Sequence, residues 1–115
     1  MKFDERQEQA AMVVRPLENR LDSYVAEEFK IHMKAIVHNG NLQVVLDLSD
    51  VEFVDSSGLG AIIATMTALR PQGQLMVCNV KDNVHALFRL TRMDRVIPVK
   101  IDVDEALRAM SNESP

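Results

Sequence analysis

The segment Val54–Gly60, VDSSGLG, carries the residue types best suited to chemistry in this chain. It stands where an extended stretch gives way to apolar residues at helical spacing. Glycines allow close approach to the backbone, and the first N–H groups of a helix favour an anion such as phosphate. Ser56 and Ser57 have two interpretations. Their hydroxyls cap the helix, which composition alone favours, or one of them is an exposed acceptor for a phosphoryl group.

Hydrolytic chemistry has little support in the sequence. A serine hydrolase needs a base beside its nucleophile, and the three histidines, His32, His38 and His85, lie where helices or their ends are expected. The DSSG sequence also departs from the G-x-S-x-G pattern of a nucleophile elbow. We therefore expect no hydrolase activity.

A receiver domain is an alternative of a different class, because Asp47 in VVLDLSD matches a phosphate-accepting aspartate at the end of a strand. Receivers hold Mg²⁺ with a carboxylate pair after the first strand, whereas Arg15 and Pro16 stand there in this chain. The receiver interpretation is therefore disfavoured.

Composition indicates one soluble domain over residues 1–115, with 47% hydrophobic and 26% charged side chains. A net charge of −4, no tryptophan and 4% aromatic residues argue against a nucleic-acid partner. Cys78 is the only cysteine, so an internal disulfide or a cysteine-rich metal site is excluded, and we expect no metal and no cofactor. Without a membrane-length apolar run or a secretory signal, we expect a cytoplasmic protein that binds other proteins.

Strands and helices alternate along the chain. Five segments are predicted as strands: 2–7, 11–17, 42–48, 74–80 and 96–101. Apolar residues at helical spacing predict four helices: 22–39, 58–69, 82–91 and 102–110. We expect Asp22 or Ser23 to cap the first helix, and Asp102 with Glu105 to form a capping box at the last. This order predicts an α/β fold, a small mixed β-sheet with helices mainly on one face, and a frayed tail at residues 111–115.

Charge is distributed unevenly along the chain. Residues 1–55 contain six basic and eleven acidic side chains, whereas residues 81–100 contain five basic and two acidic ones. Two faces of opposite charge would guide the docking of a complementary protein, although a solvated helix face accounts for the pattern equally well.

The sequence VDSSGLGAII, with LQVVLDLSDVEF before it and GQLMVCNVKDNVHALFRL after it, resembles the STAS domain family. Within that family it is most similar to the bacterial anti-sigma factor antagonists of the SpoIIAA and RsbV type. The earlier sequence RLDSYVAEEF is similar to the family's L-D-x-x-x-A-E region, which implies that Asp22 lies near the phosphorylation site. The resemblance covers nearly the whole chain and implies a mixed β-sheet flanked by helices.

The resemblance implies that the protein is a switch and not an enzyme, and that the switch is operated by phosphorylation of Ser56. The unmodified protein would bind an anti-sigma factor that is also a serine kinase, releasing a sigma factor, and a metal-dependent serine phosphatase of the PP2C type would reverse the modification. The residues expected at the partner surface surround that serine: Asp22, Asp55, Ser57, Gly58, Leu59, Gly60 and Ala61. The free protein is expected to be a monomer or a weak dimer. A STAS module serving a transporter, a lipid-trafficking complex or a sensor complex remains the alternative.

Overall fold

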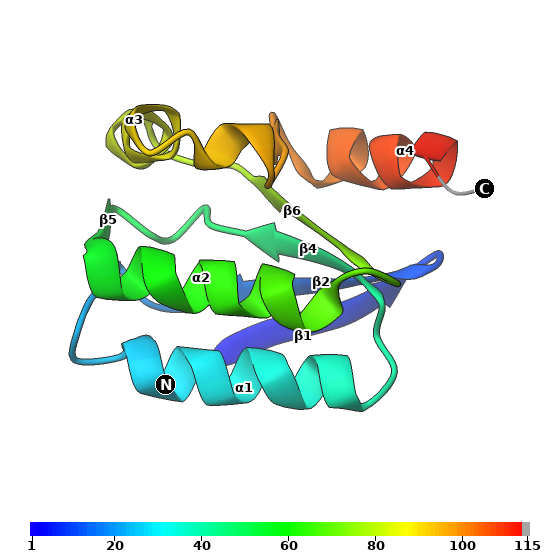
Figure 1. The fold of residues 1–115 in the computed structure, drawn as a ribbon, viewed down its shortest axis with the longest axis horizontal. Helices are drawn as coiled ribbons and strands as arrows, with labels where there is room; N and C mark the ends of the chain where they lie inside the picture. Colours follow the sequence, from blue (N-terminus) through cyan, green and yellow to red (C-terminus); the bar gives the residue numbers. More distant parts are fainter. Residues whose placement is uncertain (114–115) are drawn as a thin grey trace.

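A mixed β-sheet forms the centre of the molecule in the computed structural model, which describes residues 1–113 (Figure 1). The strands, in their order across the sheet, are β1 (Phe3–Glu8), β2 (Ala11–Pro16), β4 (Gln43–Asp47), β6 (Gln74–Cys78) and β7 (Val99–Lys100). β1 and β2 form an antiparallel hairpin, and every other neighbouring pair is parallel. Parallel neighbours need crossover helices, which cover the faces of the sheet.

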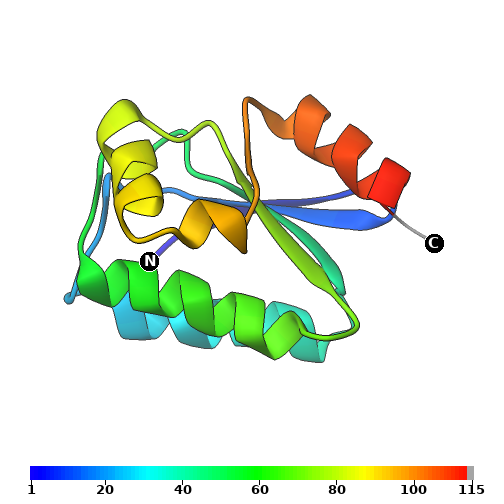
Figure 2. The ribbon, with the colours of Figure 1, turned by 45° about the horizontal axis from the view of Figure 1, so that its top comes forward.

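Four α-helices cover the sheet: α1 (Ala26–His38), α2 (Ser56–Leu69), α3 (Asp82–Leu90) and α4 (Val103–Glu113). Figures 1 and 2 show α1 and α2 side by side on one face, with α4 on the other. Buried residues of α3 belong to the same core as those of α1 and α2. A short 3₁₀ helix, η1 (Met93–Arg95), follows α3. The predicted mixed sheet with helices mainly on one face is therefore confirmed.

The central strand β4 is apolar without interruption because both of its faces are covered. Val44 and Leu46 point into the core beneath α1 and α2, whereas Val45 packs into the smaller core beneath α4. Successive side chains of a strand point to opposite faces, so a strand covered on both faces needs apolar residues at every position. β6 shows the same division between the two cores.

A separate pair of two-residue strands lies beyond the main sheet. β3 (Arg20–Leu21) and β5 (Phe53–Val54) are parallel, with Leu21 opposite Val54. Both inward residues are buried, and the pair leads directly into the turn before α1 and the start of α2. These short strands therefore fix the relative positions of the two segments that matter for the site below.

Several boundaries differ from the sequence-based predictions, and the strand predicted at 96–101 is formed by Val99–Lys100 alone. α1 begins at Ala26 rather than Asp22, and its N-cap, Val25, has no side-chain hydrogen bond. The prediction of Asp22 or Ser23 as the cap was therefore wrong, because the Leu21 end of this segment is taken into the pairing with β5. At the other end of the chain, α4 extends to Glu113, so the expected tail begins inside a helix, and residues 114 and 115 lie outside the described residues.

The capping box expected at α4 is formed in large part. Glu105 N donates to Asp102 Oδ1 at 2.9 Å, and Glu105 Oε1 accepts from Ile101 N at 2.9 Å rather than from the cap residue itself.

Across residues 1–113, none of the helices has the length and apolar character needed to cross a membrane.

Candidate functional site

Asp55 is the residue that caps α2. Its backbone is extended, with φ −97° and ψ −174°, and its Oδ1 accepts a hydrogen bond from Gly58 N at 2.9 Å. This is the geometry by which an aspartate satisfies one of the unpaired N–H groups at a helix start. The capping role that the sequence left open for the serines is therefore filled by Asp55.

Ser56 and Ser57 are the first two residues of α2, and both are exposed. Within residues 1–113, neither hydroxyl has a hydrogen-bond partner. They lie at the positive end of a fourteen-residue helix, where an anion is favoured by the free N–H groups and the helix dipole. Each hydroxyl is thus accessible to an incoming phosphoryl group, and the local field tolerates the resulting charge.

The carboxylate of Asp55 also ties the two segments of the site together. Its second oxygen, Oδ2, accepts from Ser23 N at 3.1 Å, in the turn that precedes α1. Asp55 N in turn donates to Leu21 O at 3.2 Å. The start of α2 and the turn at residues 22–25 are therefore held as one unit.

Asp22 is 8% exposed and organises that turn from within. Its Oδ2 accepts from Arg20 Nε at 3.0 Å, and its Oδ1 accepts from Tyr24 N at 3.0 Å. The hydrogen bond from Arg20 holds the pKa of Asp22 below its ordinary value, against the opposing effect of burial, and the Tyr24 N–H adds to the lowering. The structure thus places Asp22 beside the Asp55 cap, with its own carboxylate engaged by Arg20 and Tyr24.

The two glycines of α2 have different environments. A Cβ built on Gly58 would lie 2.0 Å from Leu21 O, so this glycine lets α2 approach β3. A Cβ on Gly60 would have nothing within 4 Å, and this residue is exposed. Gly58 is therefore required by the fold, whereas Gly60 is not.

The remaining predicted partner-binding residues are largely interior. Leu59 is 7% exposed and Ala61 is 4% exposed, and both belong to the main hydrophobic core. They position the exposed residues Ser56, Ser57 and Gly60. Direct contact between a partner and the buried members of the set remains a prediction.

A shallow groove runs between α1 and α2 from the Ser57 end. It is lined by small and charged residues from both helices and from the turn before α1: Ser23, Ala26, Glu27, Lys30, Ser57, Gly60, Ala61 and Ala64. Glu27 and Lys30 form an ion pair at 3.3 Å on its α1 side. Sequence reasoning did not find the groove residues that α1 contributes. Helical periodicity predicts which face of a helix is exposed, but not which other helix packs beside it.

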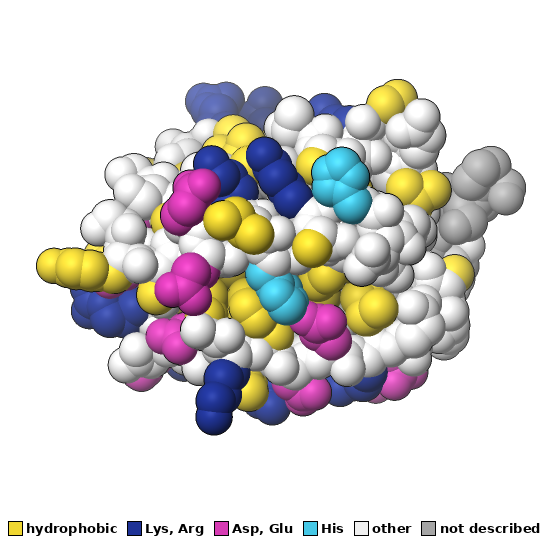
Figure 3. Space-filling model, turned by 90° about the horizontal axis from the view of Figure 1, so that it is seen from below, with side chains coloured by type: hydrophobic (Ala, Val, Ile, Leu, Met, Phe, Trp, Pro, Cys, Tyr) yellow, Lys and Arg dark blue, Asp and Glu magenta, His cyan; other side chains and the backbone are white. Residues whose placement is uncertain are grey.

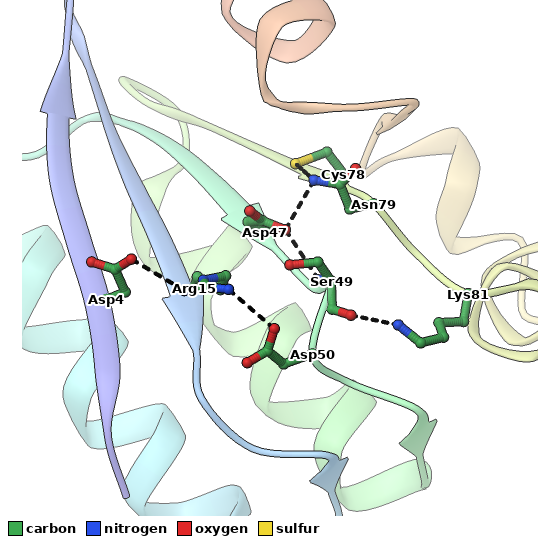
Figure 4. A network of polar contacts seen from close by, with 8 residues as sticks. All are labelled: Asp4, Arg15, Asp47, Ser49, Asp50, Cys78, Asn79 and Lys81. Carbon is green, nitrogen blue, oxygen red and sulfur yellow. Dashed lines mark hydrogen bonds and ion pairs between the residues drawn. The ribbon is translucent and has the colours of Figure 1, made fainter.

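A polar network braces the loop that connects β4 to β5 (Figure 4). Asp47 Oδ1 accepts from Ser49 N and from Asn79 Nδ2, each at 3.0 Å, and Arg15 Nη1 donates to Asp50 Oδ1 at 3.2 Å. Asp47 is thus engaged in holding the loop that leads to Ser56.

Among the described residues, no group of histidine, cysteine, aspartate and glutamate is arranged to hold a metal ion.

Cys78 lies in β6 and is fully buried, as its apolar sequence context predicts. Burial, followed by the negative charges of Asp47 and Asp102, raises the pKa of its thiol to about 12. The thiol therefore stays protonated and unreactive at neutral pH.

Comparison with known proteins gives a consistent result. A model of the STAS domain family matches residues 4–106. BtrV of Bordetella bronchiseptica, provisionally named an anti-sigma factor antagonist, is 29% identical over 105 residues, which cover 90% of each chain. The anti-sigma F factor antagonist of Paenibacillus polymyxa is 25% identical over 101 residues, 86% of each chain.

A solved structure agrees with these sequence matches. The crystal structure of an anti-sigma factor antagonist from Mycobacterium paratuberculosis superimposes with a TM-score of 0.87 and 25% sequence identity. The match covers 96% of this chain and 93% of that one. Fold and sequence therefore point to the same group of proteins over almost the full length of both chains.

Proposed function

The chain belongs to the STAS domain family, and on this basis we propose that it is an anti-sigma factor antagonist. Its unphosphorylated form binds an anti-sigma factor, which then releases a sigma factor. The observation that carries the proposal is the exposed Ser56 hydroxyl at the start of α2, left free because Asp55 makes the cap. The names of the relatives from Bordetella bronchiseptica and Paenibacillus polymyxa support the same role.

The switch is phosphorylation of Ser56. The anti-sigma factor acts as a serine kinase and transfers a phosphoryl group from ATP to Ser56 Oγ, and a PP2C-type phosphatase removes it. The protein itself acts by binding, as a monomer or weak dimer in the cytoplasm. Ser57, Gly60 and the groove between α1 and α2 continue the contact surface away from Ser56.

Phosphorylation acts at the interface rather than on the fold. A phosphate adds about −1.5 to −2 units of charge and three acceptor oxygens at an exposed position. The free N–H groups at the start of α2 accommodate an anion, so the isolated domain keeps its structure. A partner that packs over Ser56 must instead strip water from this charge and bring its own groups against it, which prevents binding.

A pull-down with four proteins tests the proposal: wild type, Ser56→Ala, Ser56→Asp and, as a matched control, Ser57→Ala. Wild type, Ser56→Ala and Ser57→Ala should capture the same anti-sigma factor, and Ser56→Asp should not. Mass spectrometry after incubation with that factor and ATP should locate phosphate on Ser56 in wild type and Ser57→Ala only.

Two outcomes would contradict the proposal. One is a folded Ser56→Asp variant that binds the anti-sigma factor as tightly as wild type. The other is capture of a transporter or sensor complex in place of any anti-sigma factor, which would identify the chain as a STAS module of another assembly. Circular dichroism of Ser56→Asp separates loss of binding from loss of folding.

A further inference from the structure

Both exposed aromatic side chains of the protein lie at the Ser56 end. The chain has one tyrosine and four phenylalanines, all of them in the described part. Phe29 and Phe88 are fully buried and Phe3 is half-buried. Tyr24 is 91% exposed and Phe53 is 39% exposed. The Tyr24 ring, which is almost entirely in water, contributes little to the hydrophobic core and remains available to a partner.

Tyr24 is held in the turn that is tied to the α2 cap. Its own N–H donates to Asp22 Oδ1 at 3.0 Å, and the N–H of the preceding residue, Ser23, donates to Asp55 Oδ2 at 3.1 Å. The backbone that carries the ring is therefore fixed relative to the first turn of α2, although the ring itself projects into solvent. This backbone is ordered before any partner arrives, which lowers the entropy lost on binding.

Phe53 is held from the other side by Arg20. The two residues are opposite each other in the β3–β5 pair, and the guanidinium carbon of Arg20 lies 4.6 Å from the centre of the Phe53 ring. The same guanidinium is anchored by its 3.0 Å contact with Asp22 Oδ2. Arg20 and Tyr24 are thus linked through Asp22, and Phe53 is linked to them through Arg20; these three residues are hereafter the aromatic patch. The turn that carries Tyr24 is bonded to Asp55, the residue before Ser56.

We infer that the aromatic patch is the anchor by which the protein partner docks on Ser56, with the Tyr24 ring inserted into an apolar pocket of that partner. Tyrosine and arginine are the side chains over-represented among residues that dominate binding energy, and such residues cluster where water is excluded. All three residues of the patch belong to residues 1–55, which carry eleven acidic and six basic side chains, so a complementary pocket has a basic rim. The inference rests on the proposed function and identifies the partner as the anti-sigma factor kinase.

The test compares Tyr24→Ala with Ile31→Ala. Ile31 is 61% exposed and lines a different hollow, with Met1, Phe3 and His32, on the α1 side of the molecule. Figure 3 looks onto that side and shows apolar side chains around a histidine. Each variant removes one exposed apolar side chain, so folding effects should match. Tyr24→Phe is added because it keeps the ring and removes only the hydroxyl.

The probe is the purified anti-sigma factor that the wild-type chain captures. Tyr24→Ala should bind it at least tenfold more weakly, while Ile31→Ala stays within twofold of wild type and Tyr24→Phe within about threefold. Phosphorylation of Ser56 at low substrate concentration should slow by the same factor for Tyr24→Ala, and the rate at saturating substrate should be unchanged. A slower rate at low substrate with an unchanged rate at saturating substrate identifies Tyr24 as a docking residue, because a disturbed Ser56 loop would also slow the saturated reaction.

Equal affinities of Tyr24→Ala and Ile31→Ala for the probe would overturn the inference while leaving the proposed function intact. A wild-type chain that captures no anti-sigma factor would overturn both. A lower rate for Tyr24→Ala at saturating substrate, with unchanged affinity, would show that Tyr24 shapes the loop and does not dock, and would also overturn the inference.

Discussion

The two glycines in the first turns of α2 should respond to alanine in opposite directions. At Gly60 the added methyl group meets nothing within 4 Å, so the substitution only removes the conformational freedom of glycine. Alanine is favoured over glycine inside a helix by about 0.8–1 kcal/mol. We expect Gly60→Ala to raise the free energy of unfolding by roughly 0.5–1 kcal/mol, which for a domain of this size raises Tm by about 2–5 °C.

At Gly58 the same methyl group would lie 2.0 Å from Leu21 O, far inside van der Waals contact. The neighbour is backbone and belongs to β3, so the start of α2 must move away and strain the Gly58 N–H bond to Asp55. Overpacking of this kind typically costs about 1–3 kcal/mol, which exceeds the gain in helix propensity. A contact of 2.0 Å with backbone puts the cost in the upper part of that range, so after the propensity gain we expect a net destabilisation of about 1–2 kcal/mol.

Urea unfolding followed by circular dichroism measures both variants against wild type, and titration with the anti-sigma factor measures binding. Gly60→Ala should be more stable and yet bind more weakly, because its methyl group stands on the surface beside Ser57. A Gly60→Ala protein less stable than wild type, or a Gly58→Ala protein as stable as wild type, would refute the packing argument. Unchanged binding by Gly60→Ala would remove that residue from the partner surface.

Two further predictions concern the carboxylates of the site. Asp55→Ala should lower the free energy of unfolding by about 1–2 kcal/mol in urea, because it removes the helix cap and the bond to Ser23, whereas Asp55→Asn should recover most of that loss. Asp22 should make stability depend on pH: its folded pKa lies below the ordinary value of 3.8, so its contribution is present above about pH 4 and is lost as the pH falls through the folded pKa. Acid unfolding of wild type should therefore be steeper below about pH 4 than that of Asp22→Asn, and equal slopes would contradict the argument.

The sequence predicted the elements that have long apolar patterns. The continuous apolar residues of β4 and the apolar residues at helical spacing in α2 each predict their element directly. Both elements lie where these patterns predicted them. The start of α1 was not predicted correctly: Asp22 is a residue type that often caps helices, but it directly follows β3, whose Leu21 is paired with β5. Two-residue strands such as β3 have no periodicity, so only the tertiary structure reveals them.

The sequence predicted which residues surround Ser56, but not what each of them does in the structure. In the sequence DSSGLG, Asp55, Ser56 and Ser57 are all competent caps, and the extended backbone at Asp55 decides between them. Gly58 and Gly60 look equivalent until Leu21, distant in the chain, is brought against one of them. The exposure of Tyr24 was equally hidden, because a tyrosine near the start of an amphipathic helix has no fixed side until that helix packs.

The arrangement of Asp55 indicates how the proposed phosphate on Ser56 would change binding without changing the fold. A charge at a helix N-terminus is stabilised by about 0.3–1 kcal/mol when exposed. Repulsion from the adjacent Asp55 carboxylate is of similar size, roughly 1 kcal/mol for exposed unit charges about 4 Å apart. The two effects oppose each other in the free protein, so its stability changes little. Beneath a partner the same dianion loses its water, which costs several kcal/mol unless the partner supplies matching charge, and binding therefore responds where folding does not.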